Sequence, residues 1–418
     1  MLLQKWFRIP SDPELENQIN DRISVKKELK HMTFKINHVT PVVFGEGTSG
    51  QTGEYLIEDG IKKVLCVCDK GVKTAGMTEK ILDSIKEKDI SIVEFDGVIL
   101  EPTVETVDEV GNLARQEKVD AVLGIGGGSA MDIAKGVNVL LGNPGSSRDY
   151  LKMGLYHQPG KALYLIPTTA GTGSEVTNVA ILYNKEAGFK QAIIGSSCAA
   201  KVAIVDPELT TSLPSILTAA TGMDAFSHAV ESYTCSIHNP LSDLLAIEAM
   251  SIIVEYLPIA VKDGSNIKAR SKMNYASTIA GMAFNSSPTH LGHAIAHAMG
   301  SIHHVPHGLG CGLLVPAVLE HLSTVIPDRI KNIAKAMGLK PHIYKNDQET
   351  GNAVANAVRK LNSDINLPAF NNLGFGEDEL PDIAREATRD ICWPLIPKET
   401  GVDDTLKLIK REYFFQDT

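Results

Sequence analysis

Two pairs of possible metal ligands stand four residues apart in this sequence. Asp224 and His228 form the first pair, His293 and His297 form the second, and His307 follows a proline ten residues later. Residues four apart lie on one face of a helix, one turn from each other. One carboxylate and several imidazoles are donors that suit a divalent first-row metal such as Fe²⁺, Zn²⁺ or Mn²⁺. The spacing therefore predicts a metal site built by side chains from different helices.

The histidines fall in a stretch of 47 residues, 273–319, that contains no Asp, Glu, Lys or Arg. The whole chain of 418 residues is 22% charged, so this gap is a local feature. Prolines, asparagines and histidines interrupt it, and no apolar run long enough to span a membrane remains. It holds six of the 13 histidines: His290, His293, His297, His303, His304 and His307. We therefore expect this stretch to be protein interior or the wall of a cleft.

Asp224 stands among uncharged residues. It is the only charged side chain in the 22 residues between Glu208 and Glu231. A carboxylate in an apolar setting needs a hydrogen-bonding partner or a metal ion, because its desolvation is otherwise costly. The alternative is that Asp224 caps a helix after Thr221-Gly222. For a lone histidine the alternative is an ordinary core residue, but six within 18 residues favour a shared task.

A glycine-rich turn lies between a predicted strand and a predicted helix in the first half of the chain. The turn consists of Gly126, Gly127, Gly128 and Ser129. Such a turn lets a phosphate approach free backbone N–H groups at the positive end of a helix dipole. With Gly124, the spacing is a near miss of the G-x-G-x-x-G fingerprint, and a plain tight turn is the alternative.

Two more predicted strands end in polar residues. Asp69 ends the apolar run 62–69, where it could accept a hydrogen bond from a ribose 2′-hydroxyl and repel a 2′-phosphate, which favours NAD over NADP. A helix N-cap is the alternative for Asp69. Thr168 and Thr169 close the run 161–169 and offer hydroxyls to a phosphate or ribose. Three such strand ends in one sheet predict a dinucleotide site.

The elements that must position these residues change in kind near residue 207. Before it, predicted strands (62–69, 91–98, 120–128, 161–169 and 201–209) alternate with predicted helices (76–89, 103–118 and 129–141). This alternation is typical of a parallel sheet with helices on both faces. After it, helical patterns follow one another at 217–234, 240–257, 269–284, 288–300, 326–338, 349–365 and 405–415. We expect an α/β NAD-binding domain over 1–207, of which 1–30 is an N-terminal extension, and a helical metal and substrate domain over 208–418.

Composition excludes several classes of protein. With 40 basic against 50 acidic residues and a net charge of −10, no strongly basic domain points to nucleic acid. Cys66 and Cys68 are two apart in a predicted strand, where a disulfide has poor geometry. The N-terminus reaches Lys5, Arg8 and Pro10 too soon for a signal peptide. We expect a cytoplasmic enzyme with reduced cysteines and with neither nucleic acid nor membrane as a partner.

Four motifs in this order resemble those of the iron-containing (group III) alcohol dehydrogenases. They are Gly126-Gly127-Gly128-Ser129-x-x-Asp132-x-x-Lys135, the segment 167–175, Gly222-Met223-Asp224-Ala225-x-x-His228, and His293-x3-His297-x9-His307-Gly308. The resemblance runs from about residue 33 to the C-terminus. It implies an α/β, Rossmann-like N-terminal domain with a parallel sheet and an all-α C-terminal metal-binding domain, on a dehydroquinate synthase-like scaffold with a cleft between the domains.

The resemblance also implies roles for single residues. The implied metal ligands are Asp224, His228, His293 and His307, and His297 is the implied non-ligand histidine beside the nicotinamide, where it could relay a proton. The implied NAD contacts are Asp69, Gly126, Gly127, Gly128, Ser129, Thr168, Thr169 and, more loosely, Lys201. The implied activity is hydride transfer between a small alcohol or aldehyde and NAD, with the alcohol oxygen bound to the divalent metal. Such enzymes are usually homodimers or larger homo-oligomers.

The sequence departs from the family pattern in two places. Glu101-Pro102-Thr103 stands where the family often has Asn-Pro-Thr, and some hydroxyacid–oxoacid transhydrogenases, which keep NAD tightly bound, look similar there. The N-terminal extension is longer than usual in bacterial members. A transhydrogenase and a non-catalytic metal-binding protein are therefore the alternatives. A dehydroquinate synthase-like lyase would need basic residues around the metal, and 273–319 has none.

Overall fold

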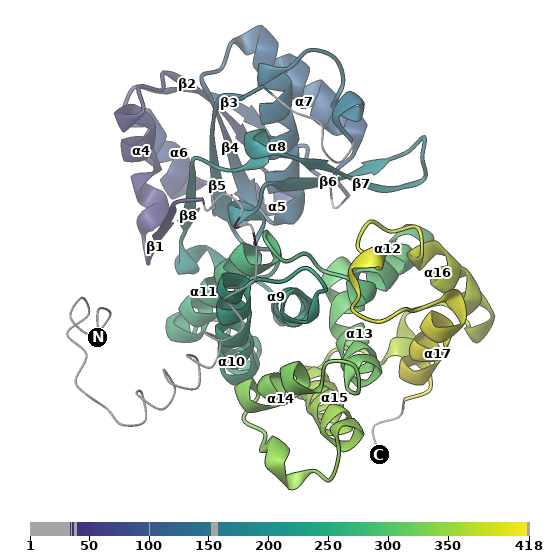
Figure 1. Cartoon of the computed structure of the whole chain (residues 1–418). Coiled ribbons are helices and arrows are strands. Elements are labelled where there is room, and N and C mark those ends of the chain that lie inside the picture. Colours follow the sequence, from purple (N-terminus) through teal and green to yellow (C-terminus); the bar gives the residue numbers. More distant parts are fainter. Residues whose placement is uncertain (1–33, 35, 37–39, 100, 152–157, 416–418) are drawn as a thin grey trace. The chain divides into compact units, whose positions relative to one another are not determined.

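A computed structural model describes the chain except for residues 1–33, 35, 37–39, 100, 152–157 and 416–418 (Figure 1). The chain divides into two units, 1–36 and 37–418. Of the first unit only Phe34 and Ile36 are described, so the predicted N-terminal extension 1–30 lies outside the described residues. All helices and strands discussed below belong to the second unit.

Six strands form a parallel sheet in the N-terminal half. They are β1 (Val42–Phe44), β2 (Lys63–Val67), β3 (Ser91–Phe95), β4 (Ala121–Gly126), β5 (Ala162–Pro167) and β8 (Val202–Val205). Their order across the sheet is β1-β8-β5-β4-β2-β3, and all neighbours are parallel. The central strands are short apolar runs, as expected for a parallel sheet buried on both faces. The five strands predicted from the sequence are thereby confirmed.

Helices cover both faces of this sheet (Figure 1). They are α4 (Thr52–Glu58), α5 (Lys70–Thr74), α6 (Glu79–Lys86), α7 (Val104–Glu117) and α8 (Gly128–Gly142). Successive residues of a strand point to opposite faces. Leu65 of β2 accordingly packs in one core with residues of α7 and α8, whereas Val64 packs in another core with residues of α4 and α6. The alternation of strands and helices in the sequence thus becomes a three-layer arrangement.

The C-terminal half of the described chain is helical. Its helices are α9 (Ser215–Thr234), α10 (Pro240–Lys262), α11 (Ile267–Phe284), α12 (Leu291–His303), α13 (His307–Leu322), α14 (Pro327–Ala336), α15 (Asp347–Asp364), α16 (Leu380–Ala387) and α17 (Val402–Tyr413). Buried residues of α9, α10, α11, α13, α14 and α15 share one core. The predicted fold class, a parallel α/β part followed by a helical part, is confirmed. The domain boundary near 207 falls between β8 and α9 and stays a prediction.

Helix α10 is the one described helix that is long and apolar enough to cross a membrane by length and composition alone. Core helices of other proteins meet the same criterion. Here α10 packs against α9 and α11, and its residues Met250, Ile253 and Leu257 are fully buried in the shared core. Its apolar composition is therefore explained by packing within the helical half.

Several elements were not expected from the sequence, among them the short elements β1, α4 and α5. An antiparallel hairpin, β6 (Val179–Asn184) and β7 (Phe189–Ile194), follows β5. Its apolar and polar residues do not alternate cleanly enough to separate two strands from the loop before them. Helix α13 was not predicted because Gly308, Gly310, Gly312 and Pro316 interrupt the helical pattern of its sequence. Helix α16 was not predicted because it is only 8 residues long.

Candidate metal centre and nucleotide site

Three helices carry the candidate metal ligands. Asp224 and His228 lie one turn apart on α9, His293 lies on α12, and His307 is the first residue of α13. Pro306 fixes the start of α13 at this point, because a proline before the first turn needs no backbone hydrogen bond there. The turn between α12 and α13 is closed by His304, whose positive φ of 56° ends α12. The chain thereby returns His307 towards the helix that carries His293.

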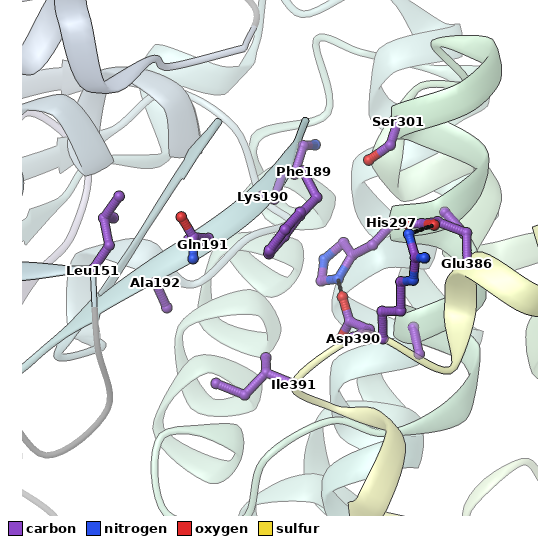
Figure 2. A pocket seen from close by; sticks show the side chains of 13 residues that line it. Leu151, Phe189, Lys190, Gln191, Ala192, His297, Ser301, Glu386, Asp390 and Ile391 are labelled. Carbon is purple, nitrogen blue, oxygen red and sulfur yellow. Dashed lines mark hydrogen bonds and ion pairs between the residues drawn. The ribbon is translucent and has the colours of Figure 1, made fainter. Parts of the chain in front are cut away.

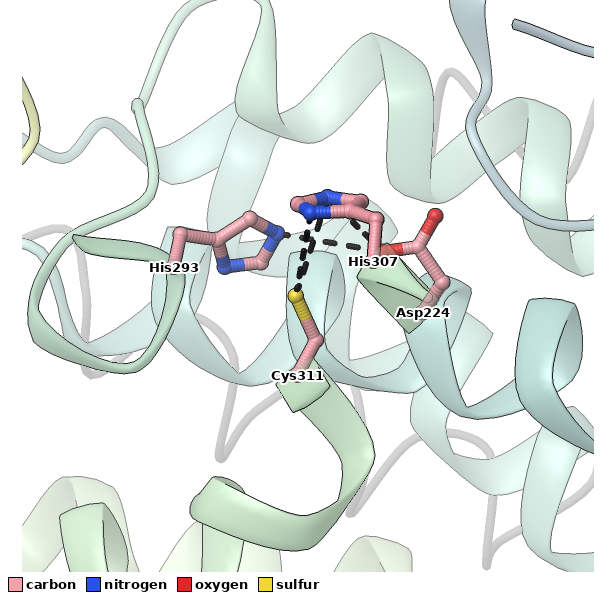
Figure 3. A group of neighbouring side chains, drawn as sticks. All are labelled: Asp224, His293, His307 and Cys311. Atoms are coloured by element: carbon pink, nitrogen blue, oxygen red, sulfur yellow. Dashed lines mark hydrogen bonds and ion pairs between the residues drawn. The ribbon is translucent and has the colours of Figure 1, made fainter. Parts of the chain in front are cut away.

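Oxygen Oδ1 of Asp224 is the centre of this group. It lies 3.8 Å from Nε2 of His228, 4.0 Å from Nε2 of His293 and 3.5 Å from Nε2 of His307. Figure 3 shows Asp224, His293 and His307 pointing towards one another. The structure thus brings together all four residues that the family resemblance implies as ligands, from positions 83 residues apart at the extremes (224 to 307).

The group is buried and its polar atoms lack partners. Asp224 is 2% exposed and His293 3%, and neither Oδ1 of Asp224 nor Nε2 of His293 has a hydrogen-bond partner. Burial lowers the pKa of His228 to about 4, against the opposing effect of Asp224. Burial and the neighbouring His297 and His293 hold the pKa of His307 well below its usual value. Neutral imidazoles and an unpaired carboxylate are what a divalent cation requires, so the donor set fits a metal ion.

Glu231 supports the group from behind, and the sequence analysis missed it. Its Oε2 lies 2.8 Å from Nδ1 of His293, and the same carboxylate accepts hydrogen bonds from the backbone N–H groups of His290 and Gly292. Burial alone would raise the pKa of Glu231, but His290 and His293 lower it to about 2. Its position seven residues after Asp224 was the available signal, since residues i, i+4 and i+7 share one helix face.

Cys311 was also missed. It lies four residues after His307 on α13, fully buried, and its Sγ faces the His307 ring (Figure 3). One donor atom each of Asp224, His293, His307 and Cys311 lie within 4.8 Å of one another. Burial, together with Asp224 and Glu231, holds the pKa of the Cys311 thiol well above its usual value. A thiol therefore lies among the candidate donors, beside one carboxylate and two of the three imidazoles.

His297 lies beside the group and lines a cavity. Its ring stacks on that of His307, with centroids 5.1 Å apart, and its Nδ1 lies 2.7 Å from Oδ2 of Asp390. The cavity, of about 310 Å³, lies between β7, α12 and the segment 386–391 (Figure 2). Figure 2 shows Phe189, Lys190 and Gln191 on β7 opposite His297. Asp390 could not be found from the sequence, because 93 residues separate it from His297.

The remaining three histidines of the charge-free stretch do not join the metal group. His290 is fully buried and its Nε2 lies 2.8 Å from the Thr234 hydroxyl. His303 stacks on Phe375 with ring centroids 4.6 Å apart. His304 ends α12. The stretch thus spans the end of α11, all of α12 and most of α13, as the interior wall that the sequence predicts.

The glycine turn lies at the carboxyl ends of β4 and β5. Gly126 pairs in register with Pro167, and the N–H of Thr168 donates to the carbonyl of Gly126 at 3.0 Å. Helix α8 begins at Gly128, and no side chain caps its first turn. Gly126 has a φ of 152°, and a Cβ atom there would lie 2.8 Å from Cβ of Ala130, so the turn needs glycine at this position. The first turn of α8 therefore begins at the carboxyl ends of β4 and β5, where a phosphate could approach the positive end of the helix dipole.

Asp69 and Thr169 stand at the same edge. Oδ1 of Asp69 accepts a hydrogen bond from the N–H of Val72 at 2.9 Å, which confirms the helix-capping alternative for this residue. Its second oxygen faces Gly126, since a Cβ atom there would lie 3.6 Å from Oδ2. The buried hydroxyl of Thr169 has no hydrogen-bond partner and lies beside Gly127. The cap leaves Oδ2 for a ribose, so the contact with NAD stays a prediction.

Lys201 does not join this edge. It stands before β8, at the amino end of a strand that runs parallel to β5, whereas Gly126 and Thr168 stand at carboxyl ends. Its ammonium pairs with Asp59. The family motif contains a different lysine, Lys135, which is fully buried and donates to the hydroxyls of Ser174 and Thr177 at 2.7 and 2.9 Å. Lys135 therefore fixes the loop after β5, and Lys201 lies apart from the nucleotide residues.

Comparison with known families gives matches to both halves of the chain. The model described as "Iron-containing alcohol dehydrogenase" matches residues 40–207, and the one described as "Fe-containing alcohol dehydrogenase family, C-terminal" matches residues 218–413. Together they cover most of the chain. The matched segments include every candidate metal ligand and every candidate nucleotide residue named above.

Individual relatives match over nearly their whole length. The chain is 34% identical to the NAD-dependent methanol dehydrogenase of Bacillus methanolicus over 369 residues, which are 88% of this chain and 97% of that protein. It is 33% identical to alcohol dehydrogenase 4 of Saccharomyces cerevisiae, over 90% of this chain and 98% of that protein. A crystal structure of 1,3-propanediol oxidoreductase superposes with a TM-score of 0.88 at 33% identity, covering 91% of this chain and 100% of that one.

Proposed function

The chain belongs to the iron-containing alcohol dehydrogenases, and on that premise we propose that Asp224, His228, His293 and His307 hold its metal ion. The protein is a metal-dependent oxidoreductase that transfers hydride between an alcohol or aldehyde and NAD(H). The hydroxyacid–oxoacid transhydrogenase and the non-catalytic metal-binding protein are not favoured by these relatives.

One observation carries the assignment of the ligands. Oδ1 of Asp224 is buried without a hydrogen-bond partner, 3.5 to 4.0 Å from a ring nitrogen of each of three histidines. An unpaired buried carboxylate is costly unless a cation joins it. When bound, a divalent metal supplies Lewis-acid chemistry to the alcohol or aldehyde group, and NAD supplies the hydride chemistry. Iron is the family's metal, and Zn²⁺ or Mn²⁺ suits the same donors.

We assign the nucleotide to the carboxyl ends of β4 and β5. Gly126, Gly127, Gly128 and Ser129 would bind the pyrophosphate through backbone N–H groups, and Thr168 and Thr169 would line the site. Asp69 would bind the adenosine ribose through Oδ2 while Oδ1 caps α5. This assignment is supported by the unpaired hydroxyl of Thr169 and by the positive φ and close packing that require glycine at position 126.

We assign the transfer of the alcohol proton to His297. Its Nδ1 is committed to Asp390, so Nε2 is the atom that would accept the proton of the alcohol, or return it in the reverse direction. Its place on the wall of the cavity supports this, because a proton relay must contact both the substrate and a path to water. The substrate would enter through this cavity of about 310 Å³, which suits a small alcohol or aldehyde.

The proposal also covers the compartment, the assembly and the domain boundaries of the protein. The expected compartment is the cytoplasm, which the six free cysteines support. The expected assembly is a homodimer or larger homo-oligomer, in line with the family. The expected domains are 1–207 and 208–418, which is supported by the change from strands to helices after β8.

Metal analysis of an anaerobic preparation tests the proposal. We expect about one divalent ion per chain and oxidation of NADH with a panel of small aldehydes. His293→Ala should lose both the bound metal and nearly all turnover. His303→Ala is the matched control, because it removes a histidine of the same helix that stacks on Phe375 instead. Full metal content and activity in His293→Ala would refute the assignment of the ligands.

A further inference from the structure

We infer that Cys311 is a further protein donor to the proposed metal, and that its sulfur makes the site prefer Zn²⁺ over Mn²⁺. The inference rests on the proposed function, because Cys311 needs the metal held by Asp224 and the three histidines. Its basis is the position of a single sulfur atom.

The Sγ atom of Cys311 lies at the distance expected for two ligands of one ion. It is 3.9 Å from Nδ1 and 3.7 Å from Nε2 of His307. Ligands held by one tetrahedral zinc at about 2.0 to 2.3 Å are separated by roughly 3.5 Å. The sulfur also belongs, with Asp224 and His293, to the group whose donor atoms lie within 4.8 Å of one another (Figure 3). One ion could therefore reach all four donors with small shifts.

Glycines on α13 bring this sulfur close to the carboxylate. A Cβ atom at Gly308 would lie 2.4 Å from the carbonyl oxygen of Ala220, and one at Gly312 would lie 2.6 Å from Cβ of Met223. Both distances are impossible for real side chains, so only glycine lets α13 approach α9 this closely. Cys311 lies between these glycines, one turn after His307, so both donors of α13 face the same point.

A buried thiol can also be a plain core side chain. Cys198 is such a residue: it is fully buried, and its thiol donates to the carbonyl oxygen of Ile193 at 3.7 Å. Cys311 has different neighbours. One donor atom each of Asp224 and His293 lies within 4.8 Å of its sulfur, and Oδ1 of Asp224 and Nε2 of His293 lack hydrogen-bond partners. A cation at their common centre would satisfy these two atoms and the sulfur together.

Coordination would replace one bond by another. The S–H bond of Cys311 breaks, its proton leaves to solvent, and a metal–sulfur bond forms, with no change of oxidation state. A thiolate is a soft donor, which favours Zn²⁺, whereas carboxylate and water donors suit Mn²⁺. The sulfur would therefore shift the preference of a site that one carboxylate and three imidazoles leave open among several metals.

Spectroscopy of the metal-loaded full-length protein tests the bond directly. In the Co²⁺ form, a cobalt–thiolate bond gives a charge-transfer absorption in the near ultraviolet. In the Zn²⁺ form, X-ray absorption should show one sulfur neighbour at about 2.3 Å. We expect both signals in the unaltered chain. Cys311→Ala should abolish both, and Cys198→Ala should keep them, because it removes a thiol of equal burial.

Metal competition gives a second readout. Cys311→Ala should bind Zn²⁺ at least about tenfold more weakly than the unaltered chain, with a smaller loss for Mn²⁺. The measurement on the unaltered zinc form requires no variant, so a Cys311→Ala protein that fails to fold leaves the test in place.

The outcomes separate the two proposals. A stoichiometric zinc complex with only nitrogen and oxygen neighbours would overturn the role of Cys311 and leave the four-ligand site standing. A sulfur signal that persists in Cys311→Ala would overturn it as well, because another cysteine would be the source. No metal binding by the unaltered chain would overturn both proposals.

Discussion

Glu231 fixes the orientation of His293: its Oε2 lies 2.8 Å from Nδ1 of the ring, and the opposite nitrogen, Nε2, is directed at Asp224. Both side chains are buried, at 1% and 3% exposure. A hydrogen bond from Nδ1 to a carboxylate selects the tautomer in which Nε2 carries the free lone pair. The carboxylate behind the ring therefore leaves the lone pair of Nε2 directed at Asp224, as the proposed role of His293 as a ligand requires.

Replacing Glu231 by Gln should weaken metal binding. The amide cannot hold Nδ1 with a full negative charge, and supporting residues of this kind usually contribute 10- to 100-fold in metal affinity. We expect the dissociation constant for Zn²⁺ to rise by about that factor in Glu231→Gln, measured by competition with a chelator. The exposed Glu255→Gln on α10 serves as the control. Equal zinc affinity in both variants would show that Glu231 only stabilises the fold.

The same carboxylate should give the metal-free protein a pH-dependent stability. Burial opposes its ionisation, but His290 and His293 lower its folded pKa from 4.5 to about 2. A lowered carboxylate pKa stabilises the fold above the unfolded pKa, and this contribution is lost as the pH falls towards the folded value. The difference in unfolding free energy between wild type and Glu231→Gln should be about 3 kcal/mol above pH 5 and shrink towards pH 2. Urea unfolding at several pH values measures it, and a difference that is constant with pH would contradict it.

Much of this arrangement was predictable, for reasons that particular residues make clear. The carboxyl end of β4 was predictable because an apolar run followed by Gly126, Gly127 and Gly128 marks a strand that ends in a turn. The proximity of Asp224 and His228 was predictable because a helix places residues four apart together. Such signals depend on neighbours in the sequence.

The rest depends on contacts that no local pattern contains. Asp390 meets His297 from 93 residues away, and Glu231 meets His293 across two helices. Cys311 is a small apolar residue by type, and only the packing of α13 on α9 brings its sulfur close to Asp224 and His293. For Lys201 the family resemblance suggested a contact with the nucleotide. The parallel register instead places Lys201 at the amino end of β8, away from the carboxyl ends of the strands where the nucleotide residues lie.

Asp69 allows a test that separates its two roles. Asp69→Asn keeps a side-chain oxygen to cap α5 but removes the charge that would repel a 2′-phosphate, whereas Asp69→Gly removes both. We expect both variants to bind NADP better relative to NAD. Asp69→Gly alone should also lose a few tenths of a kcal/mol in stability. The ratio of kcat/KM for the two cofactors measures the first effect. An unchanged ratio in Asp69→Asn would leave Asp69 as a cap only.

A buried ion network should hold the C-terminal helices together. Arg359 on α15 contacts Glu320 on α13 at 3.0 Å and Glu412 on α17, and all three residues are about 5% exposed. Arg359→Met would leave two buried carboxylates short of a partner and should lower the unfolding free energy by roughly 3 to 5 kcal/mol. Lys360→Met is the control on the same helix, because its pair with Asp364 is exposed and contributes at most about 0.5 kcal/mol. Similar losses in the two variants would contradict the importance of the network.

The contact between Asp390 and His297 should matter for turnover rather than for metal binding. Burial would raise the pKa of Asp390, but His297 holds it below its usual value, so the carboxylate stays charged against Nδ1. Asp390→Asn removes that charge and weakens the preference for the tautomer in which Nε2 can accept a proton. We expect kcat to fall by at least about tenfold, within the contribution of a positioned acid–base group, while the metal content is unchanged. Glu386→Gln, in the same cavity wall but paired with Arg389, should keep its kcat. A full kcat in Asp390→Asn would show that His297 needs no partner to carry the proton. An equal loss in Glu386→Gln would show that the loss is not specific to the contact between Asp390 and His297.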